Sequence, residues 1–183
     1  MRVISGIYKR RRFDVPKSFK ARPTTDFAKE NLFNVLEQYC DFSADGFTAL
    51  DLFAGTGSIS VELVSRGCSR VISVEKDRKH YSFIQQVMTQ LKTDTCVPLC
   101  TDVFKYINRC TTQFDLIFAD PPYALERLAD LPDLILNGDM MKNVSLFVLE
   151  HGKDNSFVDH PCFVEHREYG SVNFTFFSHN KWE

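Results

Sequence analysis

The sequence predicts an α/β fold in which the strands of a mostly parallel sheet alternate with helices. Apolar, strand-like runs recur five times, and the intervals between them carry apolar residues at helical spacing. Strands that are linked through helices pair in parallel with right-handed crossovers. Two further runs of alternating polarity flank Tyr169-Gly170, which predicts an antiparallel hairpin at one edge of the sheet.

The chain of 183 residues begins with a basic arm. Residues 1–22 carry eight basic side chains and one acid, Asp14, whereas the formal net charge of the whole chain is −2. This distribution favours a polyanionic partner met through one edge, with a solvated basic tail as the alternative. Apolar residues interleave with the charges, so we expect an ordered hairpin with strands at 2–5 and 11–15. The candidate nucleic-acid contacts are Arg2, Lys9, Arg10, Arg11, Arg12, Arg22 and Thr24.

The remaining elements belong to one domain, residues 23–183, which follows the arm of residues 1–22. RPTTD at 22–26 suits a helix start, and apolar residues recur at helical spacing from Ala28 to Tyr39. The five expected parallel strands are residues 47–53, 71–75, 97–102, 114–120 and 145–150. The helices between them are expected at about 58–66, at 77–91, through Tyr106 and Ile107, and at 126–136. The closing hairpin pairs 162–168 with 171–177.

A glycine turn with acidic neighbours marks the candidate ligand site. DLFAGTGS, residues 51–58, ends the first strand and opens a helix, and Gly55 and Gly57 permit positive φ and close approach of a ligand. Ligands of such sheets lie at the carboxyl ends of the strands, where acids close the first three strands. This combination favours a nucleoside cofactor over a plain strand-to-helix turn. The candidate cofactor-binding residues are Asp51, Phe53, Ala54, Gly55, Gly57, Glu75, Lys76, Asp102, Val103 and Asp120.

The residues around this turn narrow the choice of cofactor. Position 60 is serine, where a dinucleotide fingerprint has its third glycine, and no P-loop lysine follows. Asp51 would repel a pyrophosphate but can pair with an ammonium group. Glu75 can accept both hydroxyls of a ribose, and Asp102 can hold the exocyclic amine of adenine. S-adenosylmethionine carries all three groups, and we expect it as methyl donor, with S-adenosylhomocysteine as product.

FDLIFADPPYALE, residues 114–126, places a rigid corner at the end of the fourth strand. The two prolines have a fixed φ and no amide hydrogen, so the strand stops there. The exocyclic amine of a base is a poor nucleophile, and two acceptors for its hydrogens would favour the rehybridised, reactive amine. The Asp120 carboxylate and the Pro121 carbonyl can supply them, while Tyr123 can stack on an extruded base. The candidate catalytic residues are Asp120, Pro121, Pro122 and Tyr123.

On these motifs the chain resembles the RsmD-like family, bacterial 16S rRNA guanine-N2 methyltransferases. The matching runs are RVISG, RPTTDFAKENLFN, LDLFAGTGSISVELVSRG, VE at 74–75, DPPY and YGSVNF. The resemblance implies a Rossmann-like class I fold that uses S-adenosylmethionine, with a seven-stranded sheet of order 3-2-1-4-5-7-6. It also implies that the partner is 16S rRNA in a small ribosomal subunit or its assembly intermediate, and that the basic arm contacts this RNA.

Three residues depart from the family pattern, and none of them alters DPPY. Arg10 stands where glycine is usual and bears on the hairpin turn. Ser60 replaces a small glycine on the cofactor helix, which should tolerate a serine. Gln86 stands where asparagine is common.

Three other functions remain as alternatives. Methylation of adenine N6, in DNA or another RNA, or of a protein glutamine amide is more often served by Asn at the position of Asp120. An NAD(P)-dependent oxidoreductase is disfavoured by the missing third glycine and by DPPY. A catalytically silent RNA-binding assembly factor would leave DPPY without a purpose.

Composition gives the remaining expectations. No apolar run reaches the roughly 18 residues of a membrane span, and no apolar segment follows the basic start. The six cysteines lack C-x-x-C spacing and the five histidines lack ligand spacing. We therefore expect reduced thiols, no metal and no membrane association, in a cytoplasmic monomer.

Overall fold

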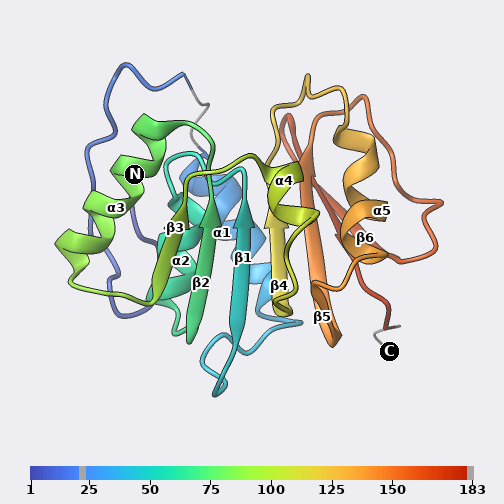
Figure 1. Cartoon of the computed structure of the whole chain (residues 1–183), viewed down its shortest axis with the longest axis horizontal. Coiled ribbons are helices and arrows are strands. Elements are labelled where there is room, and N and C mark those ends of the chain that lie inside the picture. Colours follow the sequence, from blue (N-terminus) through green and yellow to red (C-terminus); the bar gives the residue numbers. More distant parts are fainter. Residues whose placement is uncertain (21–23, 181–183) are drawn as a thin grey trace.

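The computed structural model describes residues 1–20 and 24–180, and it contains a seven-stranded sheet of order β3-β2-β1-β4-β5-β7-β6 (Figure 1). The strands are β1 (Thr48–Leu52), β2 (Arg70–Val74), β3 (Cys96–Leu99), β4 (Phe114–Ala119), β5 (Met141–His151), β6 (Phe163–Tyr169) and β7 (Val172–Phe177). The helices are α1 (Asp26–Leu36), α2 (Ser58–Ser65), α3 (Arg78–Leu91), α4 (Val103–Ile107) and α5 (Leu131–Leu136), with a 3₁₀ turn η1 (Leu128–Asp130). Strands β1 to β5 are parallel, and β7 is antiparallel to β5 and β6, which confirms the predicted order and edge hairpin.

Helices cover both faces of the sheet. Alternation within β4 sends Leu116 and Phe118 to one face and Ile117 and Ala119 to the other. The first face packs against α1, α2, α3 and the amino-terminal arm, and the second packs against α4, η1 and α5 (Figure 1). Because both faces of β4 are covered, its residues form a continuous apolar run, and this run allowed the strand to be predicted from the sequence.

The strand order reverses between β1 and β4. From β1 the chain proceeds outward through β2 and β3, and it then returns to place β4 on the other side of β1. Such a reversal leaves a crevice at the carboxyl ends of the strands. The glycine turn after β1 and the DPPY corner after β4 therefore meet at the same place.

The amino-terminal arm pairs with itself but does not form the two predicted strands. An isolated antiparallel bridge joins Arg2 to Arg12. The amide N–H groups of Ile4 and Ser5 do not continue this ladder, because each donates to a carboxylate oxygen of Glu62 on α2 at 2.9 Å. The prediction of regular strands at 2–5 and 11–15 is wrong, since a tertiary acceptor replaces the cross-strand partner.

The arm is part of the packed domain. Val3 and Phe13 are buried in the same core as α1 and α2. Gly6 has a φ of +84°, and a Cβ there would lie 1.9 Å from the carbonyl oxygen of Ser65, so the turn of the arm lies directly on the end of α2. The expected division between arm and domain at residues 22 and 23 lies outside the described residues.

Two helices differ in extent from the prediction. Thr25 caps α1 as expected, with its Oγ1 accepting a hydrogen bond from Ala28 N at 3.1 Å, but the helix ends at Leu36. The helix expected at 126–136 begins only at Leu131, after η1, with a proline in its first turn. Proline is favoured at a helix start because its missing N–H needs no acceptor there. Among the described helices, none has the length and apolar character needed to cross a membrane.

Candidate active site

A cavity of about 550 Å³ lies at the carboxyl ends of the central strands, a volume typical of small-molecule sites. It brings together the glycine turn, the acids that follow the strands, and the DPPY corner. The predicted residues that line it are Thr24, Asp51, Phe53, Ala54, Gly55, Glu75, Lys76, Asp102, Val103, Asp120, Pro121, Pro122 and Tyr123.

The turn between β1 and α2 requires glycine for two different reasons. Gly57 has a φ of +75°, and a Cβ there would lie 2.9 Å from Cγ1 of Ile84, so it lets α2 pack closely on α3. Gly55 has a φ of +57°, and a Cβ there would meet only the carbonyl oxygen of Phe53, at 4.0 Å. Phe53 itself has a φ of +58°, a conformation that is strained for a bulky residue. This locally strained residue lines the cavity, and such strain is common at functional sites.

Asp51 lies at the base of the turn, with 1% of its surface exposed. Its Oδ2 accepts hydrogen bonds from Ser60 N at 3.1 Å and from Ser60 Oγ at 2.6 Å. Burial raises the pKa of Asp51 to about 7, although the hydrogen bonds from Ser60 act in the opposite direction. A buried carboxyl group of this kind would be stabilised as an anion by an incoming cation. Ser60 therefore supports Asp51 directly, a role beyond the tolerated replacement that the sequence predicted.

Glu75 and Asp102 reach the cavity from the ends of β2 and β3. Glu75 Oε2 accepts a hydrogen bond from Gly55 N at 2.7 Å, and Oε1 accepts one from Asp77 N at 2.8 Å, so this carboxylate braces the glycine turn. Each carboxylate oxygen keeps a further lone pair for a ligand hydroxyl. Asp102 caps α4 by accepting a backbone hydrogen bond at 3.1 Å. Both acids are already anchored, which fixes their positions for a ligand.

One wall of the cavity is formed by aromatic residues, of which sequence reasoning missed Phe104. This ring lies beside the predicted Val103, and its centroid is 6.4 Å from that of Phe53 at an interplanar angle of 75°. The sequence signal that could have indicated Phe104 is its place at the start of a helix, directly after a strand that ends in an acid. The other lining residues that the sequence did not single out are Lys20, Thr25, Thr56, Ser58, Ile59, Asp77, His80, Phe118, Leu125, Glu150 and Val172.

The DPPY corner holds its side chains through backbone and side-chain contacts. Asp120 N donates to the carbonyl oxygen of Leu52 at 3.2 Å, which fixes the start of the corner against β1. The Pro122 carbonyl accepts a backbone hydrogen bond at 2.9 Å that closes the following turn. Tyr123 keeps 36% of its surface exposed, and its hydroxyl donates to Glu150 Oε1 at 2.9 Å. The ring is therefore accessible and fixed, which suits stacking on a flat ligand.

Asp120 lies in a strongly acidic environment. Burial raises the pKa of Asp120 well above its usual value, and the negative charges of Glu150 and Asp51 raise it further. A hydrogen bond between the carboxyl groups of Asp120 and Glu150 acts in the same direction. The arrangement favours a cationic ligand, because a positive charge would offset the repulsion among these carboxylates.

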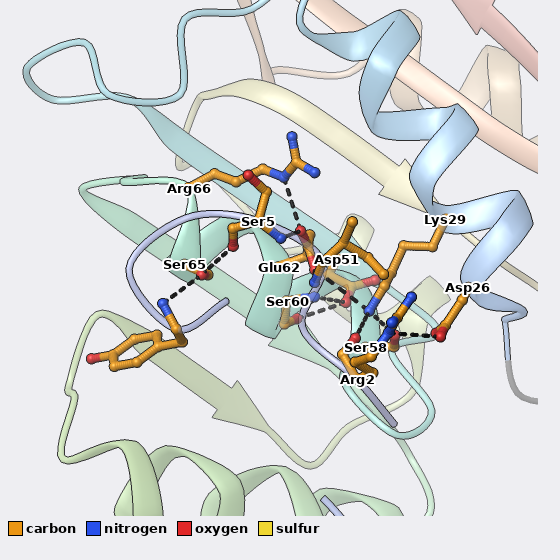
Figure 2. Close-up of polar contacts among 12 residues, drawn as sticks. Arg2, Ser5, Asp26, Lys29, Asp51, Ser58, Ser60, Glu62, Ser65 and Arg66 are labelled. Atoms are coloured by element: carbon orange, nitrogen blue, oxygen red, sulfur yellow. Dashed lines mark hydrogen bonds and ion pairs between the residues drawn. The ribbon is translucent and has the colours of Figure 1, made fainter. Parts of the chain in front are cut away.

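The beginning of the arm adjoins the cavity. Arg2 Nε pairs with Asp26 Oδ2 at 2.9 Å, and the Arg2 carbonyl accepts a hydrogen bond from the buried Lys29 ammonium (Figure 2). Lys29 also donates to Ser58 Oγ at 3.0 Å and lies 3.5 Å from Glu62 Oε2. Ser58 lines the cavity, so this buried ammonium joins the arm to the start of the helix beside the site.

The other predicted nucleic-acid contacts spread away from the cavity along α2. At the far end of that helix, Tyr8 N donates to Ser65 Oγ at 3.0 Å. A helix of this length spans about 12 Å. The backbone of Arg12 forms the antiparallel bridge with Arg2 near the cavity, whereas Lys9 and Arg10 follow Tyr8 at the far end of α2. Lys9, Arg10, Arg11 and Arg12 are all exposed, and Arg22 lies outside the described residues.

Comparison with known proteins identifies the family. A family model described as "Conserved hypothetical protein 95" matches residues 1–178. YlbH of Bacillus subtilis, whose provisional name is rRNA methyltransferase, is 36% identical over 164 residues and is aligned over 84% of each chain. Ribosomal RNA small subunit methyltransferase D of Haemophilus influenzae is 30% identical over 165 residues, which cover 86% of this chain and 82% of that protein. The chain belongs to the RsmD-like family. The resemblance that the motifs predicted is confirmed.

The fold is shared with solved structures of this kind. A structure of yhhF from Escherichia coli, titled provisionally as a methyltransferase, superposes with a TM-score of 0.84 at 22% identity, over 100% of this chain and 99% of that chain. The predicted Rossmann-like class I methyltransferase fold is confirmed by this match together with the strand order.

Proposed function

We propose that this protein transfers a methyl group from S-adenosylmethionine to the exocyclic N2 amine of a guanine in 16S rRNA, within a small ribosomal subunit or its assembly intermediate. The observation that carries the proposal is a single cavity lined by the glycine turn and by Asp120, Pro121 and Tyr123 of the DPPY corner. Membership of the RsmD-like family supports ribosomal RNA as the substrate.

The donor set of the cavity fits S-adenosylmethionine. This cofactor supplies a methyl group on a positively charged sulfur. Asp51 would hold the ammonium group, and Glu75 would accept the ribose hydroxyls. Asp102 would bind the amine of adenine, and Phe104 would pack against the base. The open space at Gly55 and the excess of carboxyl groups support this assignment, since a pyrophosphate would be repelled where an ammonium is attracted.

Asp120 and the Pro121 carbonyl would activate the target amine. The two oxygens would accept the two amine hydrogens and so favour the pyramidal nitrogen, with its lone pair directed at the methyl group. Tyr123 would stack on the extruded base, an effect of about 1–3 kcal/mol. This gain offsets much of the few kcal/mol needed to unstack a base.

The exposed basic residues of the arm would bind phosphates near the target. Arg2, Arg12 and Thr24 lie toward the cavity, and Lys9 and Arg10 would reach RNA farther from the target base. Phosphate contacts fix the register of a protein on nucleic acid, while the cavity would recognise the extruded base. The protein is expected to act as a monomer, which sedimentation in the presence and absence of RNA would test.

The Asp120→Ala variant tests the proposed chemistry. We expect methyl transfer to rRNA to fall by at least about 100-fold, because one of the two amine acceptors is lost. S-adenosylhomocysteine binding, measured by calorimetry, should persist. Asp133→Ala on α5 is the matched control, since this carboxylate is largely exposed and does not line the cavity. Near-normal turnover by Asp120→Ala would contradict the proposed activation of the amine.

Three alternatives predict other outcomes in the same experiments. A methyltransferase for adenine N6 would label adenosine, and an NAD(P)-dependent oxidoreductase would bind NAD in preference to S-adenosylhomocysteine. A non-catalytic assembly factor would bind rRNA with no transfer by the wild-type protein.

A further inference from the structure

Glu150 lies beside Asp120 in the lining of the cavity, and neither the glycine turn nor the DPPY motif includes it. Strands β4 and β5 are parallel neighbours with Ala119 opposite Leu149, so the next residues along each strand, Asp120 and Glu150, are adjacent. Glu150 lines the cavity and has 5% of its surface exposed. A buried acid at the end of β5 therefore completes the row of acids at the strand ends.

The end of β5 also fixes the ring of Tyr123. Glu150 Oε1 accepts the hydrogen bond from the tyrosine hydroxyl at 2.9 Å. Two residues further along, Gly152 faces the ring, and a Cβ there would lie 3.1 Å from Cδ2 of Tyr123. The ring is thus held at its hydroxyl by one residue and packed closely against the backbone of another. Both contacts orient the stacking surface of the cavity.

The carboxyl groups of Asp120 and Glu150 line the same cavity from adjacent strand ends, and the negative charge of Glu150 raises the pKa of Asp120. Burial and repulsion both disfavour two adjacent carboxylates. The other ionisable groups that line the cavity are Asp51 near the end of β1, Glu75, Lys76 and Asp77 after β2, Asp102 before α4, His80 on α3, and Lys20 in the loop before α1. The negative charge of Asp51 adds to the repulsion at Asp120.

We propose that Glu150 is a positioning residue that shares one proton with Asp120 in the free protein, and that this proton leaves when a ligand with a sulfonium charge binds. The proposal rests on the proposed function and extends it. Loss of the proton leaves Asp120 as a carboxylate, the better acceptor for the target amine. When the nitrogen–methyl bond forms and the sulfur–methyl bond breaks, the nitrogen loses a proton to the Asp120–Glu150 pair. The sulfur becomes neutral, and the pair regains its starting state.

Proton release on binding tests this proposal without any turnover. S-adenosylmethionine and S-adenosylhomocysteine both carry an ammonium group, but only the first has a charged sulfur. Calorimetric titrations near pH 7, in two buffers of different ionisation enthalpy, give the number of protons released by each ligand. We expect more protons to be released by S-adenosylmethionine than by S-adenosylhomocysteine. Equal release by the two ligands would overturn the proposal, whereas failure of both to bind would instead overturn the proposed function.

Glu150→Gln separates the shared proton from the support of Tyr123. The glutamine carbonyl can still accept the tyrosine hydroxyl, and its amide can donate to Asp120, which is then ionised before any ligand binds. We expect the difference in proton release between the two ligands to disappear in this variant. The exposed Glu168→Gln on β6 is the control and should keep the wild-type difference. Persistence of the difference in Glu150→Gln would assign the proton to another group and contradict the proposal.

Tyr123→Phe gives an independent readout that does not require a change at Glu150. This variant keeps the carboxyl pair and removes the hydrogen bond that anchors the ring. We expect KM for rRNA to rise about two- to tenfold, the effect of one hydrogen bond, with the proton-release difference retained. Loss of that difference in Tyr123→Phe, or an unchanged KM, would contradict the separate roles assigned to the two contacts.

Discussion

At the scale of single residues, the site depends on carboxyl groups that are buried but individually supported. Asp51 accepts two hydrogen bonds from Ser60, and Glu75 accepts backbone hydrogen bonds from the glycine turn. These contacts fix the acids before a ligand arrives. Burial of the Asp51 carboxyl group, however, destabilises the ligand-free protein when that group is ionised. Stability and ligand binding therefore make opposite demands on Asp51.

Asp51→Asn should stabilise the ligand-free protein at alkaline pH and weaken its binding of S-adenosylmethionine. The pKa of Asp51 is raised from 3.8 to about 7, so its stabilising contribution is complete below pH 3.8 and is lost as the pH rises through 7. Between low and high pH, the raised pKa of Asp51 lowers the free energy of unfolding by up to about 4 kcal/mol. Thermal melting at pH 5 and pH 8 checks this: the variant should gain several degrees over wild type at pH 8 and less at pH 5. A variant that melts lower than wild type at pH 8 would contradict the burial penalty assigned to Asp51.

At the scale of elements, the turn from β1 to α2 determines both packing and ligand access. Its two glycines act differently, since Gly57 faces Ile84 on α3 and Gly55 faces open space. The helix that follows carries Glu62, which holds the arm, and Ser60, which holds Asp51. A displacement of α2 would therefore alter the arm and the cofactor site together.

Gly57→Ala should destabilise the protein more than Gly46→Ala does. Both glycines have a φ near +75°, so both variants carry the cost of about 1–2 kcal/mol for a left-handed alanine. At Gly57 the added Cβ would also clash with Ile84, which adds about 1–3 kcal/mol, whereas no atom lies within 4 Å at Gly46. Urea denaturation measures the two free energies of unfolding. Equal losses would show that the contact with Ile84 relaxes without cost.

The strands of the sheet could be predicted from the sequence, whereas the conformation of the arm could not. The βα units were predicted because strands covered on both faces have an apolar pattern that local sequence displays. The strands expected in the arm are absent because Glu62, far along the chain, takes the amide hydrogens of Ile4 and Ser5. No local pattern encodes such a contact.

The sequence likewise predicted most of the acidic residues of the candidate site but not all of its contacts. Acids that end four strands were recognised, but Glu150, which ends the strand predicted at 145–150, was not, although it repeats the same signal. Ser60 was interpreted by size alone, whereas its hydroxyl supports Asp51. The pairing of side chains across neighbouring strands depends on strand order, which the residues alone did not give.

At the scale of the whole molecule, the basic arm extends from the cavity along one face of the sheet. The basic arm lies against α2 on the face of the sheet that α1 to α3 cover, and its start adjoins the cavity (Figures 1 and 2). The rest of the chain is acidic. This arrangement would direct a polyanion to the arm and keep it from other surfaces.

Charge reversal of Arg10, Arg11 and Arg12 to glutamate should weaken RNA binding and flatten its dependence on salt. Each lost phosphate contact should reduce the slope of log K against log salt by about one. Arg109→Glu is the control, because Arg109 is exposed and follows α4 on the opposite face of the sheet. Fluorescence anisotropy at several salt concentrations gives the slopes. An unchanged slope in the triple variant would remove these arginines from the RNA interface.

The methylated nucleoside itself tests the proposed function most directly. The protein would be incubated with tritiated S-adenosylmethionine and with naked 16S rRNA, mature small subunits or immature particles, and the labelled nucleoside identified by mass spectrometry. The expected product is N2-methylguanosine in small-subunit rRNA, formed by the wild-type protein and not by Asp120→Ala. Label on adenosine or on protein, or no transfer to any of the three substrates, would contradict the proposal.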